Sequence, residues 1–565
     1  MEQQSTYMVG CKLMHNKNSF EETSGRWRPP YGALLREQAG RIPDQVFTSI
    51  DGEEMTYRQM YERSLELAKG MVASGVGRGD HVAVLMPNCT DFTVVYFAVQ
   101  LLGGIVVPVN ARFKSRELGH VLAHSDAKML FTTDRIDEHV NFVDLIWQTI
   151  PAVADAPTGE ELNLAAAPQL KKIVLFGSSR RHPAVPVADL VAAGKNLPDT
   201  APAALLDAGS VDDIALMLYT SGTTSAPKGC QLTHRSLYHS WLKGYADAVV
   251  LAEGEKVWAP LPCYHVGGIG PMTAVLARGA TMLSSIHYEP SEALRVIREH
   301  QPEHLYPGFF TLLLPVLREP DYEKSALASA RSAIMVAPYE TQLMIKKMMP
   351  EGIKVLQIFA MTEASGYVTL TRPDASEEHR LMTSGTPLPE VEVRIAQPDT
   401  GEILSPGDEG EIQFRGPVAF RSYYGEDSAT RETILDDGWV CTGDHGRMNA
   451  DGTLYFLGRI KDMLKIGGEN VAAAEIEAYL STHPAVKLSQ VVSKPCEYYG
   501  EVAVAFIELL PGKSVTEAEI IEFCNGRLAK FKIPREVRFV TEWPMSATKI
   551  QKFKLREQLK TEIPG

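Results

Sequence analysis

The stretch YTSGTTSAPKG, residues 219–229, gathers small hydrogen-bond donors beside a single lysine. Its glycines, Gly222 and Gly229, can adopt backbone angles that other residues avoid. Hydroxyls and backbone N–H groups in such a loop, with the charge of Lys228, can hold an oxyanion. A Walker A loop is excluded, because Gly229 follows the lysine where Ser or Thr is required. The sequence therefore predicts a phosphate-binding loop, with a polar surface turn as the alternative, built from Thr220, Ser221, Gly222, Thr223, Thr224 and Lys228.

Further ionisable side chains lie among glycines and other turn-forming residues in four later stretches. They are His265 in CYHVGG, Glu363 in MTEASG, Asp444 in TGDHG, and Arg459, Lys461 and Lys465 in GRIKDMLKIGGEN. A carboxylate can accept hydrogen bonds from two neighbouring hydroxyls, and an arginine offers a planar pair of donors. Each residue alone also has an ordinary explanation: a solvated carboxylate, a turn aspartate, a surface arginine or a structural histidine.

The elements that must position these side chains alternate between strands and helices. A first series predicts strands at 81–86, 105–109 and 127–133, with helices at 90–102 and 115–125. A second predicts strands at 214–218, 257–261, 280–285, 332–337 and 355–359, with helices at 233–245 and 291–300. Apolar strands without polar alternation indicate parallel sheets covered on both faces, with phosphate ligands beyond the carboxyl ends of the strands. We expect the loop at 219–229 to lie between a strand and a helix, whose N-terminus would also favour anions.

The character of the chain changes after about residue 385. Short strands at 391–395, 410–416 and 453–457 indicate a small antiparallel unit, and the last hundred residues alternate helices at 472–483 and 517–531 with strands at 502–509 and 537–541. The sequence predicts an α/β protein. Residues 1–460 form a large N-terminal domain of doubly wound mixed or parallel sheets, which includes the antiparallel β unit at about 385–460. Residues 461–565 form a small, mobile α+β domain.

The composition of the chain argues against several classes of function. The 565 residues carry a net charge of -14, which argues against nucleic acid as a partner. The seven cysteines form no CxxC pair, and the N-terminus lacks the basic start and apolar stretch of a secretion signal. The apolar run at 92–109 is interrupted by Gln100 and Pro108, so we expect a buried helix, a turn and a strand rather than a transmembrane segment. We expect a cytoplasmic protein; homodimer formation and peripheral membrane contact stay open.

Read in order, these stretches resemble the signature of the adenylate-forming superfamily, which includes acyl-CoA synthetases, nonribosomal peptide adenylation domains and luciferases. The likeness extends from about residue 40 to the end and includes MSATKIQKFKLRE, which is similar to the family's terminal lysine motif. The resemblance implies that a carboxylate reacts with ATP, in the presence of Mg²⁺, to give an acyl adenylate and pyrophosphate. A thiol, here that of coenzyme A, then displaces AMP.

The resemblance also implies roles for individual residues. The loop from Thr220 to Lys228 would hold the β- and γ-phosphates, Glu363 with Thr224 would hold Mg²⁺, and Asp444 and Arg459 would bind the ribose hydroxyls. Phe359 stands where the family usually has Tyr and would stack on adenine, with Val336, Ala337, Pro338, Ala360, Met361 and Thr362 nearby. The acyl pocket would be lined by His265, Val266, Phe309, Val336, Ala337 and Gly366. The catalytic residues implied are Lys549, Lys228, Glu363 and His265. Lys461 would be the hinge, and Lys465, Gly467, Gly468 and Glu469 would meet coenzyme A.

This chain departs from the family pattern at three positions. Ser225, Ala360 and Thr548 each stand where a glycine is usual, and Thr548 makes the register of Lys549 less certain than the fold.

The acid is less sharply indicated. The run FFTLLLPVL at 309–317 predicts an apolar lining, which favours a medium- or long-chain fatty acid or another hydrophobic acid. Aryl and carnitine-like acids stay open, since TTSAPKG resembles the loop of carnitine-type CoA ligases. Two other functions stay open as well: an adenylating enzyme that delivers its acyl group to a carrier protein, and a catalytically silent ATP-binding relative with a scaffolding role.

Overall fold

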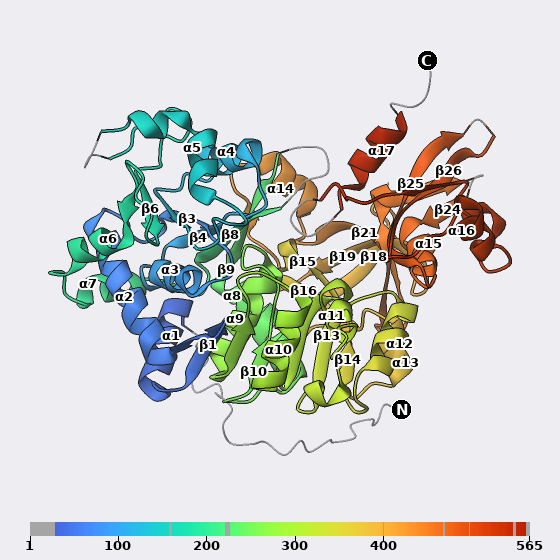
Figure 1. The fold of residues 1–565 in the computed structure, drawn as a ribbon, viewed down its shortest axis with the longest axis horizontal. Coiled ribbons are helices and arrows are strands. Elements are labelled where there is room, and N and C mark those ends of the chain that lie inside the picture. The colour runs from blue at the N-terminus through green and yellow to red at the C-terminus, as the bar shows by residue number, and fades with distance from the viewer. Residues whose placement is uncertain are drawn as a thin grey trace, which may run out of the picture.

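The computed structural model describes residues 29–157, 161–220, 226–398, 400–466, 469–496, 498–545 and 550–560. Along the long axis of Figure 1, the chain passes from the blue and cyan N-terminal helices through a green and yellow layer to the orange and red C-terminal sheet. Two large sheets and three smaller ones make up this part of the chain.

The first large sheet has eight strands in the order β20-β9-β8-β4-β3-β5-β6-β7. β4 and β5 lie on opposite sides of β3, so the winding reverses there, as predicted for a doubly wound sheet. The parallel strands are β3 (His81–Leu85), β4 (Ile105–Pro108), β5 (Met129–Thr133), β6 (Lys172–Phe176), β7 (Val185–Pro186) and β8 (Ile214–Thr220). At the far edge β9 (Lys228–Thr233) and β20 (Ser422–Tyr423) are antiparallel. The helices of this part are α2 (Tyr57–Ala73), α3 (Thr90–Leu101), α4 (Ser115–His124), α5 (Phe142–Thr149), η1 (Pro151–Asp155), α6 (Val187–Gly194) and α7 (Thr200–Asp207).

The apolar run at 92–109 forms a core helix, a turn and a strand, as expected. Every residue of α3 is buried, and β4 follows it after a tight turn at Gly103. Among the described residues, no helix is long and apolar enough to cross a membrane.

The second large sheet has seven strands in the order β14-β13-β12-β10-β11-β1-β2, all parallel except β2. Its strands are β1 (Val46–Ile50), β2 (Glu53–Thr56), β10 (Lys256–Trp258), β11 (Thr281–Ser284), β12 (His304–Phe309), β13 (Ser332–Val336) and β14 (Lys354–Leu356). Its helices are α1 (Tyr31–Arg41), α8 (His234–Tyr238), the π-helix η2 (His239–Ala246), α9 (Val266–Arg278), α10 (Pro290–His300), α11 (Phe310–Leu317), η3 (Lys324–Leu327), α12 (Tyr339–Met348) and α13 (Glu377–Met382).

Two small sheets lie between the large ones and the C-terminal part. One is β15 (Ile358–Met361), β16 (Gly366–Leu370) and β17 (Thr386–Pro387), with η4 (Thr362–Ala364) between the first two strands. The other is the predicted antiparallel unit, formed by β18 (Glu392–Ala396), β19 (Glu409–Arg415), β21 (Val440–Met448) and β22 (Leu454–Arg459), with α14 (Asp427–Thr433) beside it.

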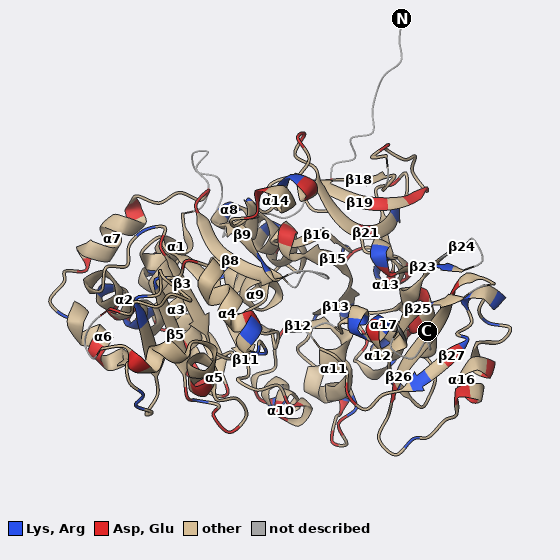
Figure 2. Cartoon of the chain, turned by 90° about the horizontal axis from the view of Figure 1, so that it is seen from above, with Lys and Arg blue, Asp and Glu red and all other residues tan. Residues whose placement is uncertain are grey.

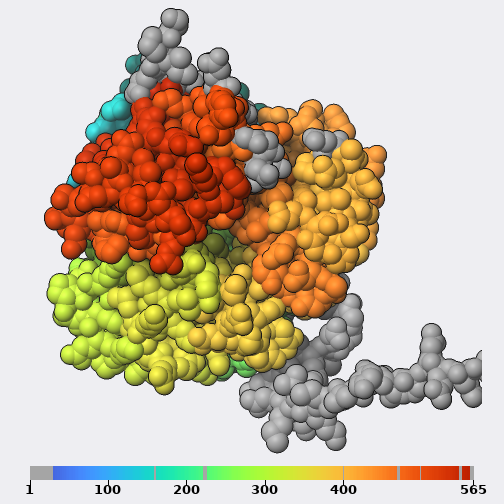
Figure 3. All heavy atoms as spheres, turned by 90° about the vertical axis from the view of Figure 1, so that its right-hand side faces the viewer, coloured from blue at the N-terminus to red at the C-terminus, as the bar shows by residue number. Residues whose placement is uncertain are grey.

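The C-terminal residues form a sheet and an apolar core of their own. The elements are η5 (Ile460–Asp462), β23 (Met463–Ile466), β24 (Glu469–Ala472), α15 (Ala473–Leu480), β25 (Val486–Cys496), β26 (Gly500–Leu509), α16 (Glu517–Cys524), η6 (Lys530–Lys532), β27 (Glu536–Phe539) and α17 (Lys552–Lys560). Figure 3 shows this orange and red part seated against the yellow-green layer. One contact between the two joins Thr341 Oγ1 of α12 to Ser481 Oγ at 3.5 Å. The α/β class is confirmed.

Three local expectations were wrong, each for a physical reason. The loop at 219–229 is followed by strand β9 rather than a helix, and helix α8 begins only at His234, where Thr233 caps it. β12 was not predicted, because Pro307 and Gly308 inside it hide the strand pattern. The helix expected at 517–531 ends at Cys524, since Gly526 adopts a left-handed backbone angle of +69°.

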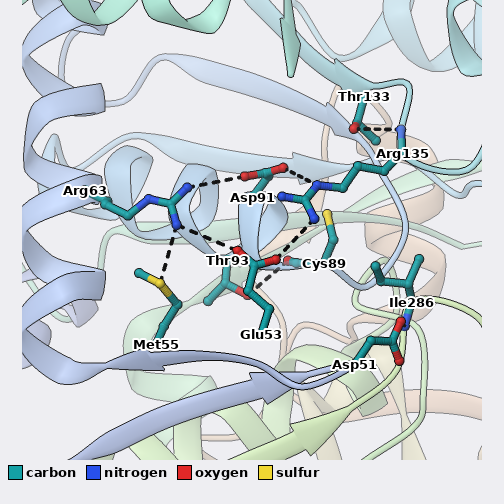
Figure 4. A network of polar contacts seen from close by, with 10 residues as sticks. All are labelled: Asp51, Glu53, Met55, Arg63, Cys89, Asp91, Thr93, Thr133, Arg135 and Ile286. Carbon is teal, nitrogen blue, oxygen red and sulfur yellow. Dashed lines mark hydrogen bonds and ion pairs between the residues drawn. The ribbon is translucent and has the colours of Figure 1, made fainter. Parts of the chain in front are cut away.

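Basic and acidic residues are interspersed along the ribbon from the N-terminal helices to the C-terminal sheet (Figure 2). The cluster in Figure 4 joins four of them from separate elements of the N-terminal layer. Asp91, at the start of α3, accepts a hydrogen bond from Arg135 Nε at 2.7 Å and lies 3.6 Å from Arg63 Nη2. Glu53 of β2 contacts Arg135 Nη1 at 3.1 Å. The Asp91 side chain is only 5% exposed, so the two arginines satisfy a carboxylate that would otherwise be costly to bury.

Candidate active site

The predicted phosphate loop connects two antiparallel strands. Thr220, the last residue of β8, pairs directly with Lys228, the first residue of β9. The loop is therefore a hairpin connection at the carboxyl end of a parallel strand, which is where phosphate ligands were expected. Ser221, Gly222, Thr223, Thr224 and Ser225 lie outside the described residues.

Lys228 and Glu363, two predicted catalytic residues, both contact the side chain of Tyr423. The Lys228 ammonium lies 5.2 Å from the centre of the Tyr423 ring, within cation–π range. The Tyr423 hydroxyl donates a hydrogen bond of 2.7 Å to Glu363 Oε1. Burial, and then the neighbouring Glu363 charge, raise the pKa of Tyr423, so its hydroxyl keeps the proton that it donates. We call Lys228, Tyr423 and Glu363 the Lys–Tyr–Glu cluster.

Sequence reasoning missed Tyr423. It lies in β20, which the sequence did not predict, and is 60 residues from Glu363. The stretch SYYGEDSAT offers two adjacent tyrosines with no periodic pattern, so nothing in it distinguishes the buried Tyr423 from its neighbour.

The two residues expected to bind ribose face each other across a strand pair. Asp444 of β21 is the cross-strand partner of Arg459 of β22, and Arg459 Nε lies 2.7 Å from Asp444 Oδ1. The Asp444 side chain is 5% exposed and the Arg459 side chain 36% exposed. The pair thus combines a fixed carboxylate with a guanidinium that solvent, or a sugar hydroxyl, can still reach.

Three of the residues expected around adenine lie at the carboxyl edge of the second large sheet, and the other four lie in or directly after β15 of a small sheet. Val336 ends β13 and pairs with Phe309, which ends β12; Ala337 and Pro338 follow Val336 and lead into α12. Phe359 lies in β15, where its ring stacks on that of Phe456 at 5.8 Å, and the next residues along the chain are Ala360, Met361 and Thr362. β15 lies beside β13, so the two groups of predicted residues come from neighbouring strands of different sheets.

Three of the residues expected around the acyl group, His265, Val266 and Gly366, lie on α9 and β16, which contact each other. The other three, Phe309, Val336 and Ala337, lie at the ends of β12 and β13. His265 is the N-cap residue of α9, and Val266 is its first residue. Gly366 has a backbone φ of +131°, and a side chain there would lie 2.4 Å from Ser240 Oγ. Glycine is therefore required at this position.

Behind Gly366 lies a cluster of four buried aromatic side chains, which sequence reasoning also missed. Trp241 packs on Tyr367 at 4.7 Å and on Tyr306 at 5.5 Å, and Tyr306 packs on Tyr245 at 5.5 Å. All four are at most 2% exposed. The Trp241 Nε1–H group donates to the Ser365 carbonyl at 2.8 Å, which fixes the indole beside Gly366.

The predicted hinge residue, Lys461, lies in the turn η5 between the two parts of the chain. Arg556 of α17 donates to the Lys461 carbonyl at 3.3 Å and to Asp462 Oδ1 at 2.6 Å. Lys552 of the same helix lines a cavity of about 170 Å³ with Arg459. The C-terminal helix thus contacts both the hinge and the predicted ribose site.

The coenzyme A residues are described only in part. The Lys465 side chain is exposed, and its backbone N–H donates to Glu501 Oε2 at 2.7 Å. The backbone of Glu469 begins β24. Gly467, Gly468, Thr548 and Lys549 lie outside the described residues.

Comparison with known proteins identifies the class. The AMP-binding enzyme family model matches residues 35–424, and the AMP-binding enzyme C-terminal domain model matches residues 475–549. The chain is 34% identical over 533 residues to the putative acyl-CoA synthetase YngI of Bacillus subtilis (strain 168), covering 93% of this chain and 96% of that protein. It is 30% identical over 538 residues to the mitochondrial medium-chain acyl-CoA ligase ACSF2 of Danio rerio, covering 94% and 88%.

A solved structure shares the whole architecture. The anthranilate CoA ligase AuaEII, crystallised with anthranoyl-AMP, superposes with a TM-score of 0.83 at 26% sequence identity, covering 94% of this chain and 97% of that one. The fold and the family models define an adenylate-forming enzyme. The chain belongs to the AMP-binding enzyme family and lies in its acyl-CoA synthetase branch.

Proposed function

We propose that this enzyme activates a carboxylic acid with a hydrophobic acyl group as an acyl adenylate and then transfers the acyl group to coenzyme A, with release of AMP and pyrophosphate. The observation that carries the proposal is the Lys–Tyr–Glu cluster, which holds a cation and a carboxylate together beside the ends of the predicted phosphate loop. The relatives named as acyl-CoA synthetase, medium-chain acyl-CoA ligase and anthranilate CoA ligase support the same reaction class.

In the first half-reaction, a carboxylate oxygen of the acid attacks the α-phosphorus of ATP, and the bond to the β-phosphate oxygen breaks. Negative charge then develops on the phosphate oxygens. Lys228 is partly buried, so its charge is less screened there than in water and stabilises that charge more strongly. Lys549 remains the residue predicted to bridge the acid carboxylate and the nucleotide.

Glu363 suits magnesium. Mg²⁺ in phosphate-transfer sites is usually held by one or two carboxylates together with the substrate phosphates. Tyr423 occupies one side of Glu363 Oε1, which orients the carboxylate without neutralising it. We propose that Glu363, with Thr224, would hold Mg²⁺, and that the bound ion would offset the charge of the triphosphate.

The nucleoside is proposed to lie between the Asp444–Arg459 pair and the edge that carries Val336 and Phe359. A carboxylate accepts both vicinal ribose hydroxyls, and the salt bridge with Arg459 keeps Asp444 in one orientation. Phe359, which is 5% exposed and stacks on Phe456, is proposed to contact adenine through its ring, a contact that needs no hydroxyl.

The acyl group is proposed to enter between His265 and Gly366. Val266 and the aromatic rings of Tyr264 and Trp241 lie beside these two residues, which supports a fatty or other hydrophobic acid. The aromatic cluster fills the space behind Gly366, so it sets the depth available to the chain. Among hydrophobic acids this favours medium-length or compact aromatic ones over long chains.

The second half-reaction requires the coenzyme A sulfur to attack the acyl carbonyl, with AMP as leaving group. We propose that the C-terminal part turns about Lys461 so that the segment around Lys465 approaches the acyl adenylate. Magnesium dependence, a cytoplasmic location and homodimer formation stay predictions.

The proposal is tested by incubating the purified protein with ATP, MgCl₂, coenzyme A and a panel of acids, and measuring pyrophosphate and acyl-CoA separately. We expect both products in equal amounts from medium-chain or aryl acids. Pyrophosphate exchange without acyl-CoA would support transfer to a carrier protein instead. ATP binding without exchange for any acid would support the silent, scaffolding alternative.

A Lys228→Gln variant provides the matched test of the site. It keeps a hydrogen-bond donor but removes the cation, and we expect the adenylation rate to fall about 10²- to 10³-fold. Lys243→Gln is its control, because Lys243 pairs with Glu390 on the surface, where both side chains are 40% exposed or more.

A further inference from the structure

Two histidines of helix α4 contact the two ends of the predicted phosphate loop. His120 Nε2 lies 2.9 Å from the carbonyl oxygen of Pro227, the residue before Lys228. His124 Nδ1 lies 2.8 Å from the hydroxyl of Tyr219, the residue before Thr220. The spacing of four residues puts both imidazoles on one face of the helix, where they stack with centroids 5.2 Å apart. Neither residue carries a role in the reaction proposed above.

The chemistry of the partners fixes how these hydrogen bonds run. A carbonyl oxygen only accepts, so His120 must donate its Nε2–H to Pro227. Burial, and then the neighbouring His120, lower the pKa of His124, while burial raises the pKa of Tyr219. At neutral pH the Tyr219 hydroxyl therefore donates to an uncharged His124. The other charged groups that act on His124 are Glu426 and Asp126.

The surrounding side chains hold the histidine pair in place. Tyr219 is 7% exposed and presents its ring edge-on to His124 at 5.8 Å, and Tyr424 packs edge-on against the same imidazole. The Tyr424 backbone N–H donates to the Gly229 carbonyl at 2.8 Å, and its hydroxyl donates to Asp126. The contacts on α4 are thus tied to the strand that carries Lys228.

We propose that His120 and His124 are positioning residues that clamp Pro227 and Tyr219 onto α4 and so fix Lys228, which follows Pro227, for contact with the triphosphate of ATP. The inference rests on the proposed function, because it takes the bound oxyanion to be that triphosphate. The β8–β9 pairing aligns Thr220 with Lys228 but leaves the Pro227 carbonyl outside the ladder. The His120 hydrogen bond restrains the residue immediately before Lys228. A side chain that is positioned in advance loses less entropy when ligand binds.

The first test compares His120→Leu with His120→Gln, because the Gln amide can place an N–H near the position of Nε2. Affinity for ATP in the presence of MgCl₂ is measured by calorimetry without acid, and KM values are measured for ATP, acid and coenzyme A. We expect His120→Leu to weaken ATP binding and raise the KM for ATP about fivefold to tenfold, the loss for one hydrogen bond, with the other KM values unchanged. His120→Gln should recover most of that loss.

The matched control is His139→Leu. His139 also stacks on a histidine, His287, at 4.7 Å, but this pair lies on the surface, and both side chains are at least 50% exposed. Its KM for ATP should equal that of the wild type. If His120→Leu behaves like the control, or if His120→Gln loses as much ATP affinity as His120→Leu, the clamp is wrong.

A double-mutant cycle of His124→Leu and Tyr219→Phe tests the other end of the loop. If the contact between His124 and Tyr219 supports ATP binding, each single change should lower the affinity for ATP, and the double change should lower it little further. Fully additive losses would contradict the clamp. If the wild-type protein binds ATP but forms no acyl-CoA, the proposed reaction is wrong, and the ATP affinities of the variants still test the clamp. If the wild-type protein does not bind ATP, the proposed reaction and the clamp are both wrong.

Discussion

The hydroxyl of Tyr423 donates a 2.7 Å hydrogen bond to Oε1 of Glu363, although the two residues are 60 positions apart. The same tyrosine ring lies under the Lys228 ammonium. One side chain therefore orients the predicted magnesium ligand and contacts the predicted catalytic cation. Sequence-based reasoning assigned roles to Lys228 and Glu363 but had no account of what holds them together.

Replacing Tyr423 by Phe should separate these two contacts. The ring remains for Lys228, but Glu363 loses a hydrogen bond to a charged group, which is worth about 1.5 to 3 kcal/mol. We expect the rate of ATP–pyrophosphate exchange to fall at least about tenfold at low magnesium, with the half-saturating magnesium concentration increased. The measurement is the exchange rate as a function of MgCl₂.

Tyr322→Phe is the control for this change. It also removes a tyrosine hydroxyl that is hydrogen-bonded, here to the Met348 carbonyl at 3.0 Å, but far from the cluster in the fold. Its magnesium dependence should match the wild type. An identical magnesium titration for Tyr423→Phe would mean that the Tyr423 hydroxyl does not orient a metal ligand.

The sequence was most informative where its stretches match the motifs of a known family. Glu363, Asp444 and Arg459 were predicted as single side chains, and the structure pairs Asp444 with Arg459 and links Glu363 to Lys228. These residues stand out through the family resemblance of the stretches that carry them, since each of them alone also has an ordinary explanation.

Packing between residues far apart in the chain could not be predicted from the sequence. β9 replaces the expected helix because KGCQLT is completed as a strand only by pairing with β8 and β20. The indole of Trp241 fits only because residue 270, on another helix, is glycine: a Cβ there would lie 1.7 Å from Trp241 Cε2. Such complementarity depends on residues far apart in the chain, and no local pattern records it.

Truncation of Trp241 should change which acids are accepted. Trp241→Ala removes the side chain that fills the space beside Gly366 and Tyr367, so we expect kcat/KM to rise about tenfold for acids several carbons longer than the best wild-type substrate. Loss of a buried tryptophan also destabilises the protein, by about 3 to 5 kcal/mol. The measurement is kcat/KM across a series of linear acids, at a temperature well below the unfolding midpoint.

Trp439→Ala distinguishes a pocket effect from simple destabilisation. Trp439 is also buried, but it packs against Arg394 and Arg415 in the antiparallel β unit. Its chain-length profile should keep the wild-type optimum. If Trp241→Ala keeps that optimum too, the aromatic cluster does not set the depth of the acyl site.

The charged cluster of Figure 4 should be a source of stability rather than of activity. Asp91→Asn removes the buried carboxylate that contacts Arg135 Nε at 2.7 Å, while Glu53 stays beside Arg135, so we expect a loss of about 2 kcal/mol in the free energy of unfolding, the value of one hydrogen bond to a charged group. Asp374→Asn, in a pair with Arg372 whose side chains are about 70% exposed, should cost less than about 1 kcal/mol. Thermal unfolding of both variants gives the comparison; equal losses would show that Asp91 contributes no more than a surface ion pair.

His234 should make the stability depend on pH. It is buried, its Nδ1 accepts a hydrogen bond from the Tyr31 backbone N–H at 3.3 Å, and burial lowers its pKa from 6.5 to about 4. Between these values the unfolded chain binds a proton that the folded chain does not, so the free energy of unfolding must fall as the pH is lowered from about 6.5 to about 4. The shift corresponds to about 3 kcal/mol over that window.

A His234→Asn variant isolates this contribution, because its amide oxygen can replace the acceptor but cannot titrate. Other buried histidines, such as His239 with its pKa of about 4, act equally in both proteins and cancel from the difference. We therefore expect the wild type to lose about 3 kcal/mol more than His234→Asn between pH 7 and pH 4, measured from urea midpoints. Parallel curves over that range would mean that His234 is protonated as readily in the folded chain as in the unfolded one.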